Sequence, residues 1–267
     1  MFPFGDAPRT SPCCLVVRRS AASGLALLVA LLALPAVLAA APPAADGWSA
    51  TLYLQQAFPK QTRTNAQIEQ INDTFGVDFD TWDDIANLSV GAKIFRRVSE
   101  RWLVGLEIDY SAGGIDGAAT ILTEAGPAEL AFEQSYSVFT DLMAAAHVSL
   151  CGSCARVEPF ALLGVGVGYE EDRTTLTLRN DYLDEALRVD NDGAFPVATA
   201  GLGVEISLGA RREWFLEAGA AYFWGRLEHY VPASGSLAPA PEVLADNDTT
   251  GPNYWLGIGW RFGSSSR

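Results

Sequence analysis

The residues with the clearest catalytic chemistry are His147 and Ser149, which stand two positions apart in an apolar run. Side chains two apart on a β-strand share a face, so the imidazole could reach the hydroxyl and activate it as a nucleophile for ester hydrolysis. The alternation of the surrounding run places both side chains on the face that carries Asp141, opposite the apolar face. We therefore expect an ordinary interior histidine and serine, in a protein that is not an enzyme.

Cys151 and Cys154 form a second motif, Cys-Gly-Ser-Cys. The spacing resembles a redox dithiol, but such dithiols open a helix that lowers the thiol pKa. These cysteines lie between two expected strands, so in an oxidising compartment we expect a disulfide that clips the turn. Two cysteines and two scattered histidines do not supply the four ligands of a zinc site. We predict no metal site and no cofactor.

A set of charged residues recurs on the strand faces that would point into a barrel. Its members, together with His147, are Lys93, Glu107, Asp109, Asp141, Glu205, Glu217 and Arg261. Buried charges must pair or change their protonation. Neighbouring strands would pair Glu217 with Arg261, joined by Glu205, and Lys93 with Glu107. We expect a polar plug that fixes the strand register. The alternative is a gate that opens when the pairs exchange and that favours cations.

The elements that must position these groups are eight runs with period-two alternation. They cover residues 48–58, 86–96, 101–110, 132–150, 157–169, 195–208, 213–226 and 253–262. The connections after the second, fourth and sixth runs are short, and the other connections are long. This pattern predicts an all-β fold: an eight-stranded antiparallel up-and-down transmembrane barrel with four long extracellular loops and three short periplasmic turns.

The two faces of these strands differ in a way that suits a membrane. In residues 101–110, Leu106 and Ile108 share one face, and Glu107 and Asp109 share the other. A soluble barrel would place the apolar face inside, so here the charged face is the inner one. Aromatic residues bracket the apolar band and predict two girdles at the membrane interfaces. They are Trp102, Tyr110, Tyr169, Trp214, Tyr222, Trp224, Trp260 and Phe262.

The closing run, Asn253-Tyr-Trp-Leu-Gly-Ile-Gly-Trp-Arg-Phe262, ends in an aromatic residue. In this it resembles the last strand of small bacterial outer-membrane barrels of the OmpA transmembrane-domain, OmpX and OmpW type. The resemblance covers residues 48–262 and specifies the architecture rather than a subfamily. One departure is the short C-terminal tail, residues 263–267, which follows the aromatic terminus. The OmpW resemblance implies, as an alternative function, a narrow channel for small hydrophobic or cationic solutes.

The His-x-Ser pair also resembles part of the active site of outer-membrane lipid A deacylases, in which a glutamate assists. Glu158 is the nearest downstream candidate for that glutamate. The residues after Ser149 are Leu-Cys-Gly, which departs from the asparagine- and glycine-containing stretch of that family. A lipid A-modifying hydrolase is therefore the second alternative function.

The N-terminal segment predicts export. Arg18 and Arg19 precede an apolar run that contains Pro35 and ends in small residues, which is the layout of a cleaved signal peptide, residues 1–39. The barrel domain would then span residues 40–262. The net charge of -14 argues against nucleic acid as a partner, because phosphate binding needs a basic surface.

We expect a bacterial outer-membrane protein, a monomer whose partners are outer-membrane lipid, lipopolysaccharide and the barrel-assembly machinery. The first long loop, Pro59–Ile85, is acidic and contains a helical stretch at residues 66–72 that ends near Gly76. A solvated face or weak divalent-cation binding would account for its acids. The leading prediction is a non-enzymatic barrel that supports the membrane or presents acidic extracellular loops for contact with a ligand or surface.

Overall fold

The computed structural model describes residues 47–82, 87–151 and 156–262, with the backbone alone for residues 136–140. The expected signal peptide, the segment 40–46 and the tail lie outside the described residues. The described elements are β1 Trp48–Ala57, α2 Thr62–Phe75, β2 Asn87–Arg97, β3 Trp102–Thr123, β4 Gly126–Ser149, β5 Val157–Arg179, β6 Asp184–Leu208, β7 Trp214–Ser234, β8 Glu242–Asp248 and β9 Gly251–Phe262.

Eight of the strands close into a ring. Consecutive strands from β1 to β7 pair antiparallel, and β9 pairs with both β7 and β1. The closing pair runs in register from Ala57 opposite Asn253 to Trp48 opposite Phe262. Closure leaves no strand edge unpaired within the apolar band, as the lack of water in a bilayer requires. The predicted eight-stranded antiparallel barrel is confirmed.

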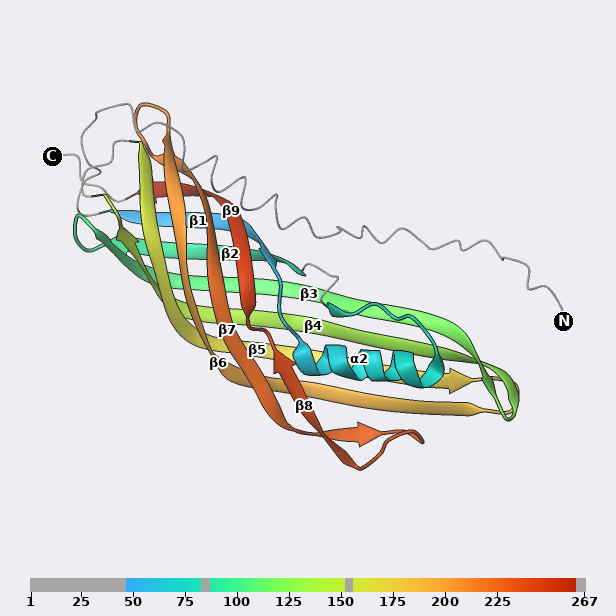
Figure 1. Ribbon diagram of the computed structural model, residues 1–267. Helices are drawn as coiled ribbons and strands as arrows, with labels where there is room; N and C mark the ends of the chain where they lie inside the picture. The colour runs from blue at the N-terminus through green and yellow to red at the C-terminus, as the bar shows by residue number, and fades with distance from the viewer. Residues whose placement is uncertain (1–46, 83–86, 152–155, 263–267) are drawn as a thin grey trace, which may run out of the picture.

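The strands continue far beyond the ring at one end only. β3 runs to Thr123 and β4 starts at Gly126, while β5 runs to Arg179 and β6 starts at Asp184. β8 follows the same edge of β7 as β9 does, farther from the ring. Three of the long connections expected as loops therefore consist mostly of strand (Figure 1). At the opposite end the connections are short, as predicted.

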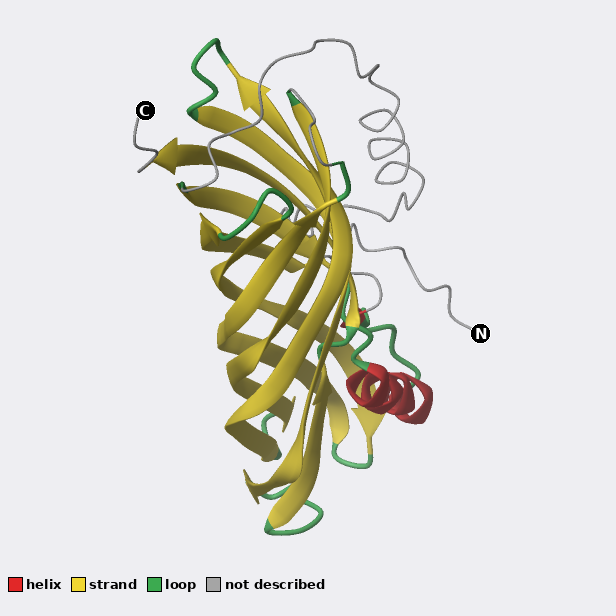
Figure 2. Ribbon diagram, turned by 90° about the vertical axis from the view of Figure 1, so that its left-hand side faces the viewer, coloured by secondary structure: helices red, strands yellow, loops and turns green. Residues whose placement is uncertain are grey.

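Because β1, β2 and β9 stop near the end of the ring, the longer strands form an open, curved sheet outside it. We call this sheet the extension; it comprises the outer parts of β3 to β7 together with β8 (Figure 2). The helix α2 lies against the extension and fills the place of the missing wall. The extension is the part of the fold that the alternation of the sequence did not predict.

The two faces of the ring are distributed as predicted. Leu106, Val165 and Ile258 on the outer face are 52%, 64% and 49% exposed. Glu107 and Glu217 on the inner face are 3% and 1% exposed. An apolar exterior around a charged interior is the arrangement of a transmembrane barrel, in which lipid replaces water on the outside.

Aromatic rings placed over glycines fill the interior of the ring. A Cβ atom on Gly219 would lie 2.3 Å from the ring of Trp255, and one on Gly259 would lie 2.1 Å from that of Phe215. Glycines on the inner face therefore make room for large side chains on neighbouring strands. The ring encloses a packed core in the half of the lumen nearer the short turns, which we call the inner half.

Gln61 precedes the helix α2, and Gly76 follows it. Both residues have left-handed backbone conformations, with φ of 43° and 66°, respectively. This helix confirms the helical stretch predicted in the first loop. Its Ile68 is buried with Trp82 and Phe132 on the inner face of the extension. Among the described residues, no helix is long and apolar enough to cross a membrane.

Candidate functional site within the lumen and extension

The inner half of the lumen holds a set of matched charges. The Lys93 ammonium lies 3.0 Å from Glu217 Oε1 and 3.5 Å from Glu107 Oε1. Trp255 donates its indole N–H to Glu217 Oε1 at 2.7 Å. The ammonium also lies over the Trp255 ring, 4.4 Å from its centroid. Lys93 and Glu107 thus form the expected pair, and Glu217 joins them from the far side of the ring.

The pairing of Glu217 with Arg261 is wrong. Arg261 Nη2 lies 2.5 Å from Glu205 Oε2, and its Nη1 donates to Ser207 Oγ at 2.9 Å. Glu205 and Glu217 stand opposite each other on β6 and β7. Face parity therefore could not decide which carboxylate Arg261 reaches. We call Lys93, Glu107, Glu205, Glu217 and Arg261 the paired cluster.

The outer half of the lumen, which is the half nearer the extension, has carboxylates without matching cations. Asp109 and Asp141 stand opposite each other on β3 and β4, and Glu170 lies diagonally across on β5. These three residues, the acidic cluster, are each at most 3% exposed. Within the described chain, none of them forms an ion pair with lysine, arginine or histidine. Tyr53 Oη, 2.7 Å from Asp109 and 2.8 Å from Glu107, shares one hydrogen between the two carboxyl groups.

The structure does not assemble the hydrolytic constellation that the His-x-Ser motif suggested. The His147 ring is stacked between Phe95 and Phe160, at centroid distances of 4.2 Å and 4.1 Å. Neither of its nitrogens has a hydrogen-bond partner. Ser149 donates its hydroxyl to the Cys151 carbonyl at 2.7 Å. Glu158, the third candidate, pairs with Arg97 at 3.3 Å.

His147, Glu205 and Glu217 bring possible metal-ligand atoms within 4.8 Å of one another. Both carboxylates are already bound by fixed cations, Glu217 by Lys93 and Glu205 by Arg261. A metal ion here would have to displace these cations, so we assign no metal to the group.

Cys151 is disulfide-bonded. Cys154, its expected partner, lies outside the described residues.

The aromatic residues expected in the girdles lie on the outer face of the ring. Trp102, Trp214 and Trp260 are 44%, 51% and 46% exposed near the short-turn end. Tyr110, Tyr169 and Trp224 are 46%, 39% and 45% exposed near the extension. Phe262, near the short-turn end, and Tyr222, near the extension, are half-buried. The apolar band therefore ends close to Tyr169 on β5, and the residues beyond it belong to the extension.

A groove in the extension has a lining that mixes polar and apolar side chains. It has a volume of about 420 Å³ and lies between α2, the inner faces of β4 to β6, and β8. Gln67 and Gln70 of α2 face Leu176 and Val189 of the sheet across it. Arg63, Asp172 and Asp246 add charges to these amide groups and apolar side chains, and such a mixture suits a polar or amphipathic ligand.

Charged residues at the groove differ in their surroundings. Burial raises the pKa of Asp172, which lines the groove, to about 6, although Gln134 donates a hydrogen bond to its carboxylate. Hydrogen bonds from Arg188 and Arg173 lower the pKa of Asp190, an exposed residue on β6. Asp172 thus has no ion pair among the described residues, whereas Asp190 has two.

Sequence reasoning missed the groove and several polar residues at the outer end of the lumen. Ser111 and Glu170 continue the inward parity of Asp109 and Gly168, so the alternation could have found them had the strands been extended. Gln61, which lies between β1 and α2, carries no such signal.

The ring, its apolar exterior and its packed interior define a small eight-stranded transmembrane β-barrel, and the resemblance expected from the sequence is confirmed at this level. Among solved structures, the chain is similar to Ail, the attachment invasion locus protein of Yersinia pestis, with 11% identity over 82% of this chain and 100% of Ail (TM-score 0.41). It is also similar to the outer membrane protein OprG from Pseudomonas aeruginosa, with 13% identity over 83% of this chain and 98% of OprG (TM-score 0.44). No protein-family profile matches the sequence, and no curated protein matches it.

Proposed function

We propose that this chain is a non-enzymatic outer-membrane barrel that contacts a ligand or surface through its extension. The observation that carries this proposal is the contrast between a packed lumen and an open groove. Lys93, Glu217 and Trp255 meet inside the ring with aromatic side chains around them. Outside the ring, α2 and the extension enclose the groove of about 420 Å³. A rigid sheet that carries a binding hollow is a common design for recognition.

The cellular setting is part of the same proposal. The apolar band and the girdles support insertion in a bacterial outer membrane, and the layout of residues 1–39 supports a signal peptide that is removed on export. The exposed acidic positions of the extension would face the lipopolysaccharide layer. The closed ring supports a monomer inserted by the barrel-assembly machinery.

A narrow cation channel is the second candidate, favoured by the acidic cluster in the outer lumen. Single-channel recording in planar bilayers separates the two functions. We expect no conductance steps from the native protein. We expect steps from a Tyr53→Ala, Trp255→Ala double variant, which removes the two rings beside Lys93. Steps of similar size from both proteins would refute a packed lumen and support transport.

The groove is tested by binding to an array of bacterial and host glycans. Gln70→Trp places a large ring in the groove, and Glu69→Trp places one on the outer side of the same helix turn. Signals lost only in Gln70→Trp support the proposal. An array on which the native protein binds nothing, or on which both variants bind like the native protein, would count against it.

A further inference from the structure

The floor of the groove changes from polar to apolar along the strands that form it. β5 runs away from the ring here and β6 returns beside it (Figure 1). The opposed pairs that line the groove, taken from the ring outward, are Asp172 with Asn191, Thr174 with Val189, and Leu176 with Leu187. The first and last pairs are about 13 Å apart along the strands. The groove therefore has a polar inner end and an apolar outer end.

The inner end of the groove is closed by a contact between β8 and β5. Asn247 of β8 donates an amide hydrogen to Glu170 Oε1. Glu170 lies two positions before Asp172 on the same face of β5. Gln134 of β4 donates to Asp172 Oδ2 at 3.2 Å. These hydrogen bonds, together with the pairing of Asp172 with Asn191, gather polar side chains from four strands around one end of the groove.

Three side chains at this inner end carry a buried oxygen atom without a hydrogen-bond partner. The atoms are Asp172 Oδ1, Asn191 Oδ1 and Asn247 Oδ1. Asn191 and Asn247 are 4% and 5% exposed. The hydrogen bond to Glu170 uses the amide nitrogen of Asn247, so its oxygen remains an acceptor. A buried acceptor without a partner is costly, so these atoms point to a ligand that donates hydrogen bonds.

The inner end also lacks a positive charge. Asp172 and Glu170 form no ion pair among the described residues. Asp246, the other acid that lines the groove, is bound by Arg226 at 2.7 Å. Arg63 of α2 lines the groove too, but it is exposed and pairs with no acid in the part of the chain that the structure describes. Water could donate to the free oxygens, but it would leave the negative charge unbalanced.

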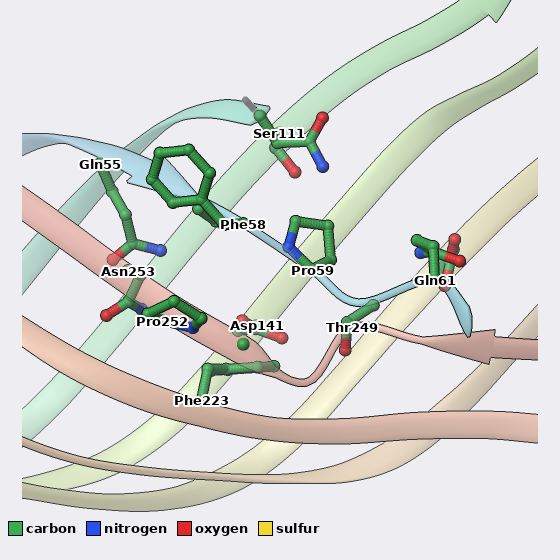
Figure 3. A pocket seen from close by; sticks show the side chains of 14 residues that line it. Gln55, Phe58, Pro59, Gln61, Ser111, Asp141, Phe223, Thr249, Pro252 and Asn253 are labelled. Carbon is green, nitrogen blue, oxygen red and sulfur yellow. The ribbon is translucent and has the colours of Figure 1, made fainter. Parts of the chain in front are cut away.

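A smaller cavity nearby has a different character. Its volume is about 60 Å³, and it lies between the ring and the segment before α2 (Figure 3). Phe58, Pro59 and Pro252 lie between its polar residues Gln61 and Asn253. The polar side chains of this cavity are therefore kept apart, whereas those at the inner end of the groove are joined by register and hydrogen bonds.

We propose that the groove binds an amphipathic amine, with its ammonium group beside Asp172 and its apolar chain along Leu176 and Leu187. The inference rests on the proposed function, because it assigns a class of ligand to the same groove. An ammonium group supplies both the hydrogen-bond donors and the positive charge that the inner end lacks. An alcohol would supply a donor without the charge, and a carboxylate would supply neither.

Trp82 provides a reporter for the inner end of the groove. Its indole N–H donates to Gln134 Oε1 at 2.7 Å, and Gln134 in turn donates to Asp172. Trp255, whose indole N–H donates to Glu217 inside the ring, is the internal control. An ammonium group bound at Asp172 should therefore shift the indole N–H resonance of Trp82 in an NMR spectrum and leave that of Trp255 in place.

The test titrates the full mature chain, refolded in detergent, with hexylamine, hexanol and hexanoate, which are similar in length and differ in charge. Hexylamine should shift the Trp82 resonance and bind at least tenfold more tightly than the other two compounds. Asp172→Asn should weaken hexylamine binding at least tenfold. Asp190→Asn, the same change at an exposed acid of β6, should leave binding unchanged, and Arg63→Gln should not weaken it.

The inference is overturned by a Trp82 resonance that does not move at millimolar hexylamine, or by hexanol that binds as tightly. Tighter binding of hexanoate would make Arg63 the anchor instead. Hexylamine binding that persists in Gln70→Trp would place the amine outside the groove. The three compounds decide the outcome on the native protein, without any variant.

Failure of this inference is distinguishable from failure of the proposed function. If amines do not bind but glycan binding is lost in Gln70→Trp, the groove remains the binding site and only the class of ligand is wrong. If neither amines nor glycans bind, both proposals fail. Gel mobility before heating shows whether each variant is folded.

Discussion

The same strands surround both halves of the lumen, but the two halves differ in charge. The carboxylates of the inner half have cations beside them, and those of the outer half do not. In the inner half, Lys93 and Arg261 meet the carboxylates of Glu217 and Glu205 at 3.0 Å and 2.5 Å. In the outer half, Asp109, Asp141 and Glu170 have no cation from the described chain. Removing water from a carboxylate is costly unless a partner replaces it. The paired cluster therefore balances its own charges, whereas the acidic cluster has no such balance among the described residues.

The largest effect is expected from breaking the paired cluster. Lys93→Met leaves Glu217 and Glu107 without their cation in a dry interior. We expect it to lower the free energy of unfolding by about 3–5 kcal/mol. Urea unfolding in lipid vesicles, followed by tryptophan fluorescence, measures this change.

Lys60→Met, at an exposed lysine, is the matched control for Lys93→Met and should change stability little. Adding Glu107→Gln and Glu217→Gln to Lys93→Met should restore most of the loss, because the two partners of Lys93 then carry no charge. A Lys93→Met barrel as stable as the native protein would remove the distinction between the two halves.

An effect of intermediate size tests which carboxylate of the paired cluster Arg261 binds. Arg261→Ala should cost about 2 kcal/mol, because it leaves Glu205 unpaired. In double-mutant cycles, Arg261 should couple to Glu205→Gln by at least about 1 kcal/mol and to Glu217→Gln by less than about 0.5 kcal/mol. The opposite ranking of the two couplings would restore the pairing expected from the sequence.

The smallest effect concerns Asp172, which lies on β5 in the extension, two residues beyond Glu170 of the acidic cluster. Its folded pKa of about 6 lies above the ordinary value of 3.8, so the folded state holds the proton more tightly than the unfolded state does. Stability is therefore greater at low pH and is lost as the pH rises through about 6. Between pH 5 and pH 7.5 we expect the extension to lose on the order of 1 kcal/mol.

Hydrogen exchange of β4 and β5 at the two pH values measures this loss. Asp172→Asn should reduce the pH dependence. Asp190→Asn, at an exposed acid held by Arg188 and Arg173, should leave it in place. Equal pH dependence in the native protein and in Asp172→Asn would assign the effect to other groups.

The ring was predictable from the sequence because contact with lipid constrains the residues on its outer face. Wherever a strand crosses the apolar band, one face must be apolar, so residues such as Leu106 and Glu107 reveal their sides by alternation alone. Outside the band both faces of a strand can be wetted, and the alternation fades. The run from Thr174 to Leu178 is strand, but its threonines and leucines carry no lipid constraint. For this reason the extension was expected as loops.

The candidate site was predictable only in part. The alternation along a strand gives the face on which a residue lies, but not which side chains it contacts across the lumen. The interior position of Lys93 followed from its strand, and so did its contact with Glu107 on the next strand. Its contact with Glu217 crosses the lumen between strands that are not neighbours, which pairwise reasoning along the sheet does not detect. Gln61 lies outside any strand, so its place at the cavity depends on the path of the chain into α2.

The uneven strand lengths have a consequence for solubility of the part outside the bilayer. Beyond Ser111, the described part of β3 has no partner strand on one side, and β8 has none beyond β7. Exposed sheet edges invite pairing between copies of a protein, and charge on the edge opposes such pairing. Asp116 lies on one free edge and Glu242 on the other, and both are exposed. Negative charge at these edges would oppose pairing between neighbouring copies.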